Sequence, residues 1–191
     1  PKVVLCDTSF LGTLPERAFL AGYAEVLKMA LVFDKDFYKF LIENQKLVSL
    51  RDEVTLLHII DKSLELKSKV VEIDETEQGD RALLNFGHTF GHALETYFSY
   101  SEKLLHGEAV SLGIVLAARF SNQEGYLSER KLENIYDHLQ SIKLPTVTTQ
   151  IHNAKLDILK LLTFMKQDKK VIGDNINLIL LKDIGNGFIE R

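Results

Sequence analysis

The sequence predicts a mainly helical fold, with a short strand at its start and a small strand or hairpin near its end. Apolar residues recur every three or four positions along most of the 191 residues, which is the period of a helix. The β-branched, apolar run at residues 1–7 predicts the first strand. A turn signal at residues 173–175, followed by the apolar run 176–181, predicts the second strand or hairpin.

Each helix has its own signal. The first begins at Thr13–Glu16, which has the spacing of a capping box with an early proline, and runs to Phe33. Ser128 has the character of an N-cap for a helix that ends at Ser141. The segment 107–123 has a broad apolar face, so we expect it to be central. Further helices are predicted over residues 34–44, 54–71, 83–98 and 156–165.

Composition excludes several classes of function. A net charge of −4 offers no basic surface for a nucleic acid. No apolar tract is long enough to span a bilayer, so we expect no membrane role. The single cysteine, Cys6, cannot form an internal disulfide, which favours a reducing cytoplasm. The strand-like start has no initiator Met and no nearby partner strand, so we expect an upstream domain to which this strand belongs.

The segment Asn85–Ala93 combines glycines and histidines in a pattern that otherwise predicts helix. In one helix, Gly87 and Gly91 would form a stripe of small residues beside a stripe of His88 and His92. An interior glycine costs about 1 kcal/mol relative to alanine, so the pair suggests a backbone that another group approaches closely. The alternative is a helix packed on a neighbour, with its histidines satisfied by hydrogen bonds.

Glu25 lies among small apolar residues in the first predicted helix, so its carboxylate needs a partner. Either a metal ion or Lys28 meets that need, and the alternative is an ordinary surface pair three residues apart. One carboxylate and two imidazoles are a typical protein ligand set for a catalytic Zn²⁺. The spacing of His88 and His92 favours that pair, but His106 is equally able to fold back, and spacing alone does not decide between them.

Several cations fall near the polar ends of these helices. Together they could converge on a phosphate or a carboxylate. Taken singly, each is more simply explained as a solvated side chain. They are Lys28, Lys67, Lys69, Arg81, Lys169 and Lys170.

Five motifs together resemble the 3-dehydroquinate synthase family, and the resemblance covers nearly the whole chain. It implies the helical C-terminal domain of a two-domain enzyme over residues 15–191, with residues 1–14 left from the N-terminal NAD-binding domain. Related sugar-phosphate cyclases share many of these motifs, and metal-dependent polyol dehydrogenases share the two-domain plan. The motifs are Asp7–Pro15, Ala24–Lys28, Arg81–Glu95, His106–Val110 and Asp168–Lys170.

The resemblance also implies the roles of individual residues. Glu25, His88 and His106 would hold Zn²⁺, or Co²⁺ in its place, while His92 stays off the metal and moves protons. Glu77 would support a catalytic hydrogen-bond network. Phe10, Leu11, Gly12 and Thr13 match the stretch that lies along NAD. The implied substrate contacts are Lys28, Lys67, Arg81, Asn85, His92 and one of Lys169 and Lys170.

The activity implied by the resemblance is conversion of 3-deoxy-D-arabino-heptulosonate 7-phosphate to 3-dehydroquinate and phosphate, in the shikimate pathway to aromatic amino acids. It proceeds by transient oxidation with NAD, phosphate elimination, reduction and aldol closure. Family membership also implies a homodimer. We expect the 191 residues to be inactive alone, because the nicotinamide must come from elsewhere. The alternatives are another sugar-phosphate cyclase, a polyol dehydrogenase, and a non-catalytic helical metal-binding module.

Overall fold

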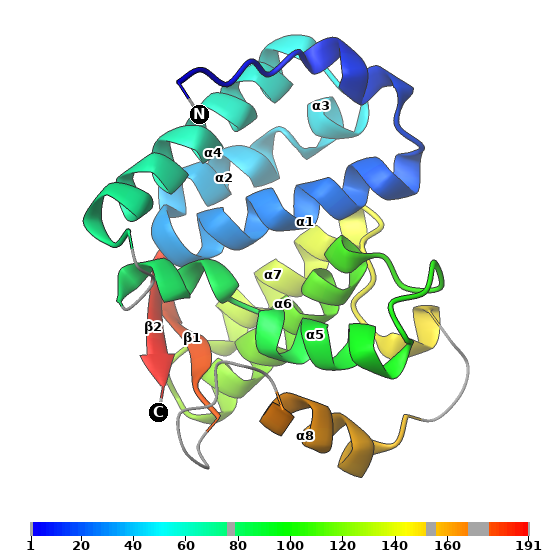
Figure 1. Cartoon of the computed structure of the whole chain (residues 1–191). Coiled ribbons are helices and arrows are strands. Elements are labelled where there is room, and N and C mark those ends of the chain that lie inside the picture. The colour runs from blue at the N-terminus through cyan, green and yellow to red at the C-terminus, as the bar shows by residue number, and fades with distance from the viewer. Residues whose placement is uncertain (1, 76–78, 152–155, 168–175, 191) are drawn as a thin grey trace.

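The computed structural model describes residues 2–75, 79–151, 156–167 and 176–190. Within these ranges the fold is mainly helical and includes one hairpin, which confirms that part of the prediction (Figure 1). The helices are η1 (Thr8–Thr13), α1 (Glu16–Phe33), α2 (Lys35–Glu43), α3 (Gln45–Ser49), α4 (Glu53–Ile73), η2 (Asp80–Asn85), α5 (His88–Tyr97), α6 (His106–Gln123), α7 (Glu129–Ser141), η3 (Thr148–Gln150) and α8 (Ile158–Gln167). The strands are β1 (Leu178–Asp183) and β2 (Asn186–Glu190).

Caps in the sequence define the first helices. Asp34 ends α1, and its side chain accepts hydrogen bonds from the backbone N–H groups of Asp36 and Phe37 at the start of α2. Asp52 caps α4 in the same way, through the N–H of Thr55. The short α3 was not predicted, because five residues carry too little pattern to be recognised.

Helix α6 forms the centre of the molecule, as its broad apolar face predicted. Most of its side chains are buried, including Val110, Ile114 and Ala118. In Figure 1, α1 lies between α2 and α4 on one side and α5 and α6 on the other. Buried side chains of α1 and α6 belong to one continuous hydrophobic core.

The predicted helix over 83–98 is wrong in its first third. Residues 80–85 form η2, and Gly87 then adopts a left-handed conformation with φ of 77°, so that α5 begins only at His88. A Cβ at Gly87 would lie 2.8 Å from the backbone nitrogen of Ile114. The expected close approach to a glycine is therefore present, but Gly87 and Gly91 do not share one helix.

The C-terminal strands pair with each other in antiparallel register, with Ile179 opposite Ile189 and Leu180 opposite Phe188. Their turn lies at residues 184–185, and the N–H of Gly185 donates to the carbonyl of Leu31, which fixes the hairpin on α1. The turn predicted at 173–175 lies outside the described residues.

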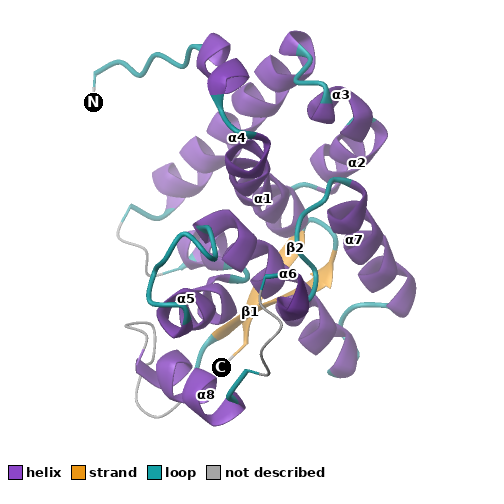
Figure 2. Ribbon diagram, turned by 90° about the vertical axis from the view of Figure 1, so that its right-hand side faces the viewer, coloured by secondary structure: helices purple, strands orange, loops and turns teal. Residues whose placement is uncertain are grey.

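The strand predicted at residues 1–7 is not observed. Residues 2–7 have no regular secondary structure, and Figure 2 shows this segment extending away from the helices. Val3 is 72% exposed and Leu5 is 91% exposed. A strand needs hydrogen bonds from a neighbouring strand, and the two strands in the described residues pair only with each other.

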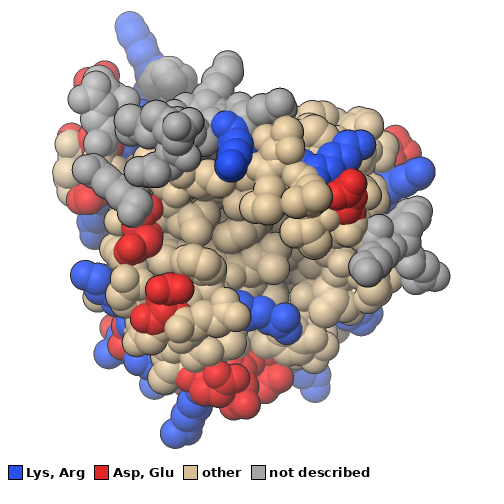
Figure 3. All heavy atoms as spheres, turned by 90° about the horizontal axis from the view of Figure 1, so that it is seen from below, with Lys and Arg blue, Asp and Glu red and all other residues tan. Residues whose placement is uncertain are grey.

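No described helix is both long enough and apolar enough to cross a membrane. The face seen in Figure 3 carries acidic and basic side chains scattered around a central area of uncharged residues. That mixture agrees with the small net charge of −4.

Candidate metal centre

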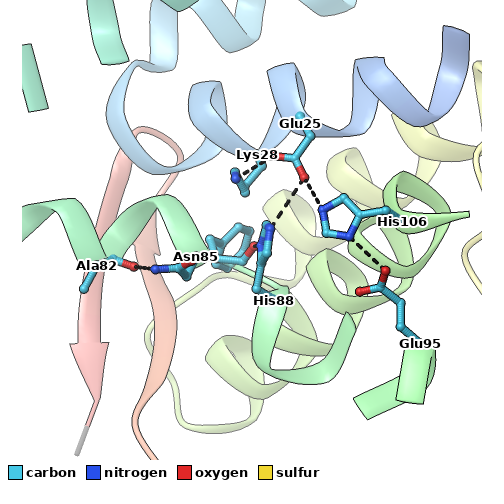
Figure 4. A network of polar contacts seen from close by, with 8 residues as sticks. Glu25, Lys28, Ala82, Asn85, His88, Glu95 and His106 are labelled. Carbon is cyan, nitrogen blue, oxygen red and sulfur yellow. Dashed lines mark hydrogen bonds and ion pairs between the residues drawn. The ribbon is translucent and has the colours of Figure 1, made fainter. Parts of the chain in front are cut away.

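Three helices bring one carboxylate and two imidazoles together. Glu25 lies in the middle of α1, His88 is the first residue of α5, and His106 is the first residue of α6 (Figure 4). One ligating atom from each lies within 4.8 Å of the others. His88 follows Glu25 by 63 positions and His106 follows His88 by 18, so the tertiary fold brings the three residues together.

The distances fit a single small cation. Glu25 Oε1 lies 3.1 Å from Nε2 of His106 and 3.5 Å from Nε2 of His88. Two ligands in tetrahedral positions, each about 2.1 Å from Zn²⁺, lie about 3.4 Å apart. The donor set is also the one found in catalytic zinc sites, where three protein ligands leave a position for substrate. The residues present therefore fit Zn²⁺ or Co²⁺.

A contact at Nδ1, the ring nitrogen that faces away from Glu25, orients each imidazole. Nδ1 of His88 lies 3.3 Å from the carbonyl oxygen of Phe86, and Nδ1 of His106 lies 3.0 Å from Oε1 of Glu95. Since a carbonyl and a carboxylate can only accept, each Nδ1 carries the proton in this arrangement. The Nε2 atoms face the carboxylate of Glu25, and at His106 a bound cation would take the place of the Nε2 proton that this carboxylate favours.

Glu25 also contacts Lys28, whose Nζ lies 2.6 Å from Oε2. The pair is not the surface pair of the simplest alternative, because Lys28 is only 6% exposed. The largest influence on the pKa of Glu25 is burial, which raises it, but the hydrogen bonds and charges of His106 and Lys28 outweigh burial and lower the pKa to about 2. The carboxylate is therefore ionised at neutral pH, as a metal ligand must be.

The two histidines have opposite pKa shifts. Burial, together with the charge of Lys28, lowers the pKa of His88 to about 4. The hydrogen bond to Glu25, supported by the one to Glu95, raises the pKa of His106 to about 8. His88 is thus neutral at pH 7, whereas His106 lies between two carboxylates that favour its proton or a cation in the proton's place.

Close backbone contacts at glycines hold the three ligands in position. A Cβ at Gly107 would lie 1.9 Å from the carbonyl oxygen of Ala21, one helical turn before Glu25. A Cβ at Gly113 would lie 2.0 Å from the carbonyl oxygen of Gly87, which precedes His88. The backbone of α6 therefore touches both α1 and the start of α5, at residues next to the candidate ligands.

A salt bridge fixes the start of α6. Nε and Nη2 of Arg17 each lie 2.6 Å from one oxygen of Glu108, and Arg17 also donates to the carbonyls of Glu102 and Lys103. Glu108 in turn accepts from the N–H of Leu105. This forked arrangement joins α1 to the loop that delivers His106.

Other residues predicted for the site lie around this cluster. The ring of His92 is centred 5.2 Å from that of His88, but His92 is outside the set of three ligating atoms. Burial lowers the pKa of Lys28, and the charge of Lys67, on α4, adds to this effect. Arg81 and Asn85 lie in η2, where their side chains donate to the carbonyls of Glu75 and Ala82.

The residues predicted along NAD lie before α1. Phe10, Leu11, Gly12 and Thr13 belong to η1, and Arg51 donates to the carbonyls of Leu11 and Gly12. About 14 Å of helix separates the start of α1 from Glu25, since a helix rises 1.5 Å per residue. The remaining predicted residues, Glu77, Lys169 and Lys170, lie outside the described residues.

Sequence reasoning gave no role to Glu95, although a signal for it existed. Glu95 lies seven residues after His88, and residues two turns apart share one face of a helix. It is 8% exposed, so its carboxylate needed a partner. The missing information was that His106 would meet that face.

Fold and site together define a helical domain with a candidate catalytic metal centre. The family described as 3-dehydroquinate synthase C-terminal matches residues 22–171. The chain belongs to this family.

The 3-dehydroquinate synthase of Acinetobacter baumannii is 44% identical over 191 residues, covering 100% of this chain and 51% of the relative. That of Bartonella quintana is 42% identical over 193 residues, with the same coverage. The chain therefore spans about half the length of these curated relatives.

Two solved structures have the same fold. One is a 2-epi-5-epi-valiolone synthase from Streptomyces hygroscopicus with NAD⁺ and Zn²⁺ bound, with a TM-score of 0.84 and 25% identity over 96% of this chain and 50% of that chain. The other is a 2-deoxy-scyllo-inosose synthase complexed with carbaglucose-6-phosphate, NAD⁺ and Co²⁺, with a TM-score of 0.80 and 25% identity over 97% of this chain and 50% of that chain.

Proposed function

We propose that the protein carrying this chain is a 3-dehydroquinate synthase, which converts 3-deoxy-D-arabino-heptulosonate 7-phosphate to 3-dehydroquinate and phosphate. The observation that carries the proposal is the convergence of Glu25, His88 and His106, in a chain that belongs to the corresponding C-terminal family. Identity of 42–44% to curated synthases over the whole chain supports the same activity.

Glu25, His88 and His106 would hold the metal. A divalent ion bound there supplies Lewis acidity that stabilises negative charge on the substrate, and NAD⁺ supplies a transient hydride acceptor. His88 is buried and has its Nδ1 at a carbonyl, so it presents Nε2 without a proton at neutral pH. The ionised Glu25 supplies the negative charge that makes the set selective for a cation.

The remaining residues would bind and orient an anionic substrate. Lys28 is buried beside Glu25, and the charge of Lys67 acts on it, so two ammonium groups lie near the candidate metal centre. Arg81 offers a planar fork for a phosphate or carboxylate, and Asn85 offers an amide donor. His92 lies beside His88 and would move a proton to and from a substrate hydroxyl. Glu77 and one of Lys169 and Lys170 complete the proposed set.

We assign the cofactor mainly to residues beyond this chain. Residues 15–191 would form the metal- and substrate-binding domain, while residues 1–14, including Phe10–Thr13, would border NAD. The coverage of about half of each relative supports a second half that binds the dinucleotide. The full protein would be a homodimer in the cytoplasm, where one exposed cysteine, Cys6, needs no partner.

A second candidate function is another sugar-phosphate cyclase. The observation that favours it is the close structural match to synthases of 2-epi-5-epi-valiolone and 2-deoxy-scyllo-inosose. Their identity to this chain is 25%, well below the 42–44% of the curated 3-dehydroquinate synthases. The first function is therefore preferred.

The test uses the complete natural protein with NAD⁺ and Zn²⁺. We expect heptulosonate phosphate to yield phosphate and 3-dehydroquinate in equal amounts, with no net NADH. Net NADH without phosphate release would instead identify a polyol dehydrogenase, and turnover of other sugar phosphates only would identify a different cyclase. The 191 residues alone should be inactive.

Two variants separate an enzyme from a non-catalytic module. We expect His92→Ala to lose turnover while metal content stays unchanged, because His92 is outside the ligand set. The matched control is Glu133→Gln, at an exposed position on α7, which should retain full activity. A His92→Ala variant as active as the control would contradict the proposed role of His92, and a complete protein without any turnover would favour the module.

A further inference from the structure

Two contacts, one at each ring nitrogen, determine how His106 is held. The side chain is 49% exposed, so packing constrains it far less than His88, whose side chain is 10% exposed. Its Nε2 lies 3.1 Å from Oε1 of Glu25, and its Nδ1 lies 3.0 Å from Oε1 of Glu95 (Figure 4). The ring orientation therefore depends on two carboxylates from two other helices.

We infer that Glu95 is a positioning residue, which orients His106 for the metal and keeps the proton on Nδ1. The inference rests on the proposed metal site and deepens it. When Nε2 of a neutral imidazole binds a cation, the proton must be on Nδ1, and that proton needs an acceptor. Glu95 Oε1 is at hydrogen-bond distance from this atom.

Glu95 is itself held firmly. It lies on α5 and is 8% exposed, so its carboxylate is largely shielded from solvent. The same helix carries His88 seven residues earlier, and both side chains point to the α1–α6 side of α5 (Figure 4). One rigid helix therefore supplies a ligand directly and orients a second ligand through Glu95.

The contrast with His88 explains why Glu95 matters. His88 has its Nδ1 at the carbonyl oxygen of Phe86, a backbone acceptor that substitution cannot remove. His106 has a side-chain acceptor in the equivalent place, so its orientation can be lost by one substitution. We expect removal of this acceptor to weaken metal binding about 10–100-fold, the usual effect of losing such an outer contact.

The test measures metal binding by the full chain, not turnover. Co²⁺ is titrated into wild type, Glu95→Ala and Glu95→Gln, with its visible absorption as the signal, and Zn²⁺ affinity is measured by competition with a chelator. We expect Glu95→Ala to raise the Kd about 10–100-fold and to change the Co²⁺ spectrum. Glu95→Gln should recover much of the affinity, because an amide oxygen still accepts from Nδ1–H.

Two controls sharpen the experiment. Glu133→Gln removes one negative charge at an exposed position on α7 and should bind Co²⁺ like wild type. Glu95→Asp keeps the charge but shortens the side chain by one methylene, so its carboxylate no longer reaches Nδ1. Glu95→Asp should therefore weaken metal binding as Glu95→Ala does. If circular dichroism shows that Glu95→Ala does not fold, Glu95→Asp replaces it in the comparison.

The outcomes separate this inference from the metal site on which it rests. Wild-type affinity in both Glu95→Ala and Glu95→Asp, with Co²⁺ binding intact in wild type, would overturn the inference alone. A wild-type chain and complete protein that bind neither Co²⁺ nor Zn²⁺ would overturn the metal site and, with it, the role of Glu95.

Discussion

The carboxylate of Glu25 and the imidazole of His106 lie 3.1 Å apart, although they are 81 positions apart in the chain. Helix α1 delivers one and the first residue of α6 delivers the other. The other oxygen of the same carboxylate contacts Lys28, so Glu25 links a buried ammonium group to the candidate metal centre. This relationship makes the energetics of Glu25 and Lys28 interdependent.

We expect a double-mutant cycle to reveal this dependence. Glu25→Ala leaves the ammonium of Lys28 buried without its anion, which should lower the free energy of unfolding of the metal-free chain by about 1–3 kcal/mol. In a Lys28→Met background, the same change should cost much less. Urea unfolding of the four proteins measures the coupling. Equal costs of Glu25→Ala in both backgrounds would contradict the interaction.

We expect Gly107→Ala to be severely destabilising. Its Cβ would lie 1.9 Å from the carbonyl oxygen of Ala21, so α1 and α6 would have to separate, at a cost of about 3 kcal/mol. Gly22→Ala, one residue after Ala21, is the matched control: nothing lies within 4 Å of its added Cβ. It should raise stability by about 0.5–1 kcal/mol. Thermal unfolding measures the Tm of both variants, and we expect that of Gly107→Ala to be much lower. Similar Tm values would contradict the close contact at Gly107.

Arg17→Ala tests the salt bridge that fixes the start of α6. Glu108 is 8% exposed and, among the described residues, would keep only the N–H of Leu105 as a donor. Because Arg17 itself is half exposed, we expect a loss of about 1–3 kcal/mol in the free energy of unfolding. Arg130→Ala, at an exposed position on α7, should change it by less than about 0.5 kcal/mol. A neutral effect of Arg17→Ala would show that the bridge adds nothing.

Stability should depend on pH through His138, a buried histidine outside the metal centre. Burial lowers its pKa from 6.5 to about 4, and its Nε2 lies 3.0 Å from the hydroxyl of Tyr23. Between these two values the unfolded chain binds a proton that the folded chain does not, so the free energy of unfolding falls as the pH drops from 6.5 toward 4. The loss approaches a few kcal/mol, at about 1.4 kcal/mol per pKa unit.

The check is urea unfolding at several pH values in wild type and His138→Gln, which keeps a polar partner for Tyr23. His88 has a similarly lowered pKa and contributes equally in both proteins, so the difference between the two curves isolates His138. Parallel curves would exclude His138 as a source of the pH dependence.

The helices with caps and clear periodicity were predictable from sequence. The broad apolar face of α6 indicated its central position, and Ser128 precedes α7 as expected, although its side chain makes no capping hydrogen bond. The capping box expected at Thr13–Glu16 is absent, because Pro15 precedes α1 and the hydroxyl of Thr13 donates to the carbonyl of Phe10 instead. The start of α5 was not predictable, because the turn at Gly87 depends on contact with Gly113 in another helix. The prediction of a strand at residues 1–7 was wrong for a related reason, since a strand depends on hydrogen bonds from a neighbouring strand.

The candidate site was only partly accessible to reasoning from spacing. The interval of four residues favoured His88 with His92, whereas the structure brings His88 and His106 to Glu25. The resemblance to a known family, and not spacing, selected these three residues beforehand. Glu95 was overlooked because its partner comes from a different helix, and such contacts leave no local pattern.

The origin of the three ligands in three separate helices links occupancy of the site to the integrity of the fold. An ion held by α1, α5 and α6 acts as a crosslink that the unfolded chain cannot form. At a free metal concentration 1,000 times the Kd, mass action would add about 4 kcal/mol to stability. Depletion of the ion would then shorten the half-life of the protein as well as remove its activity, because a less stable chain is degraded faster by proteases.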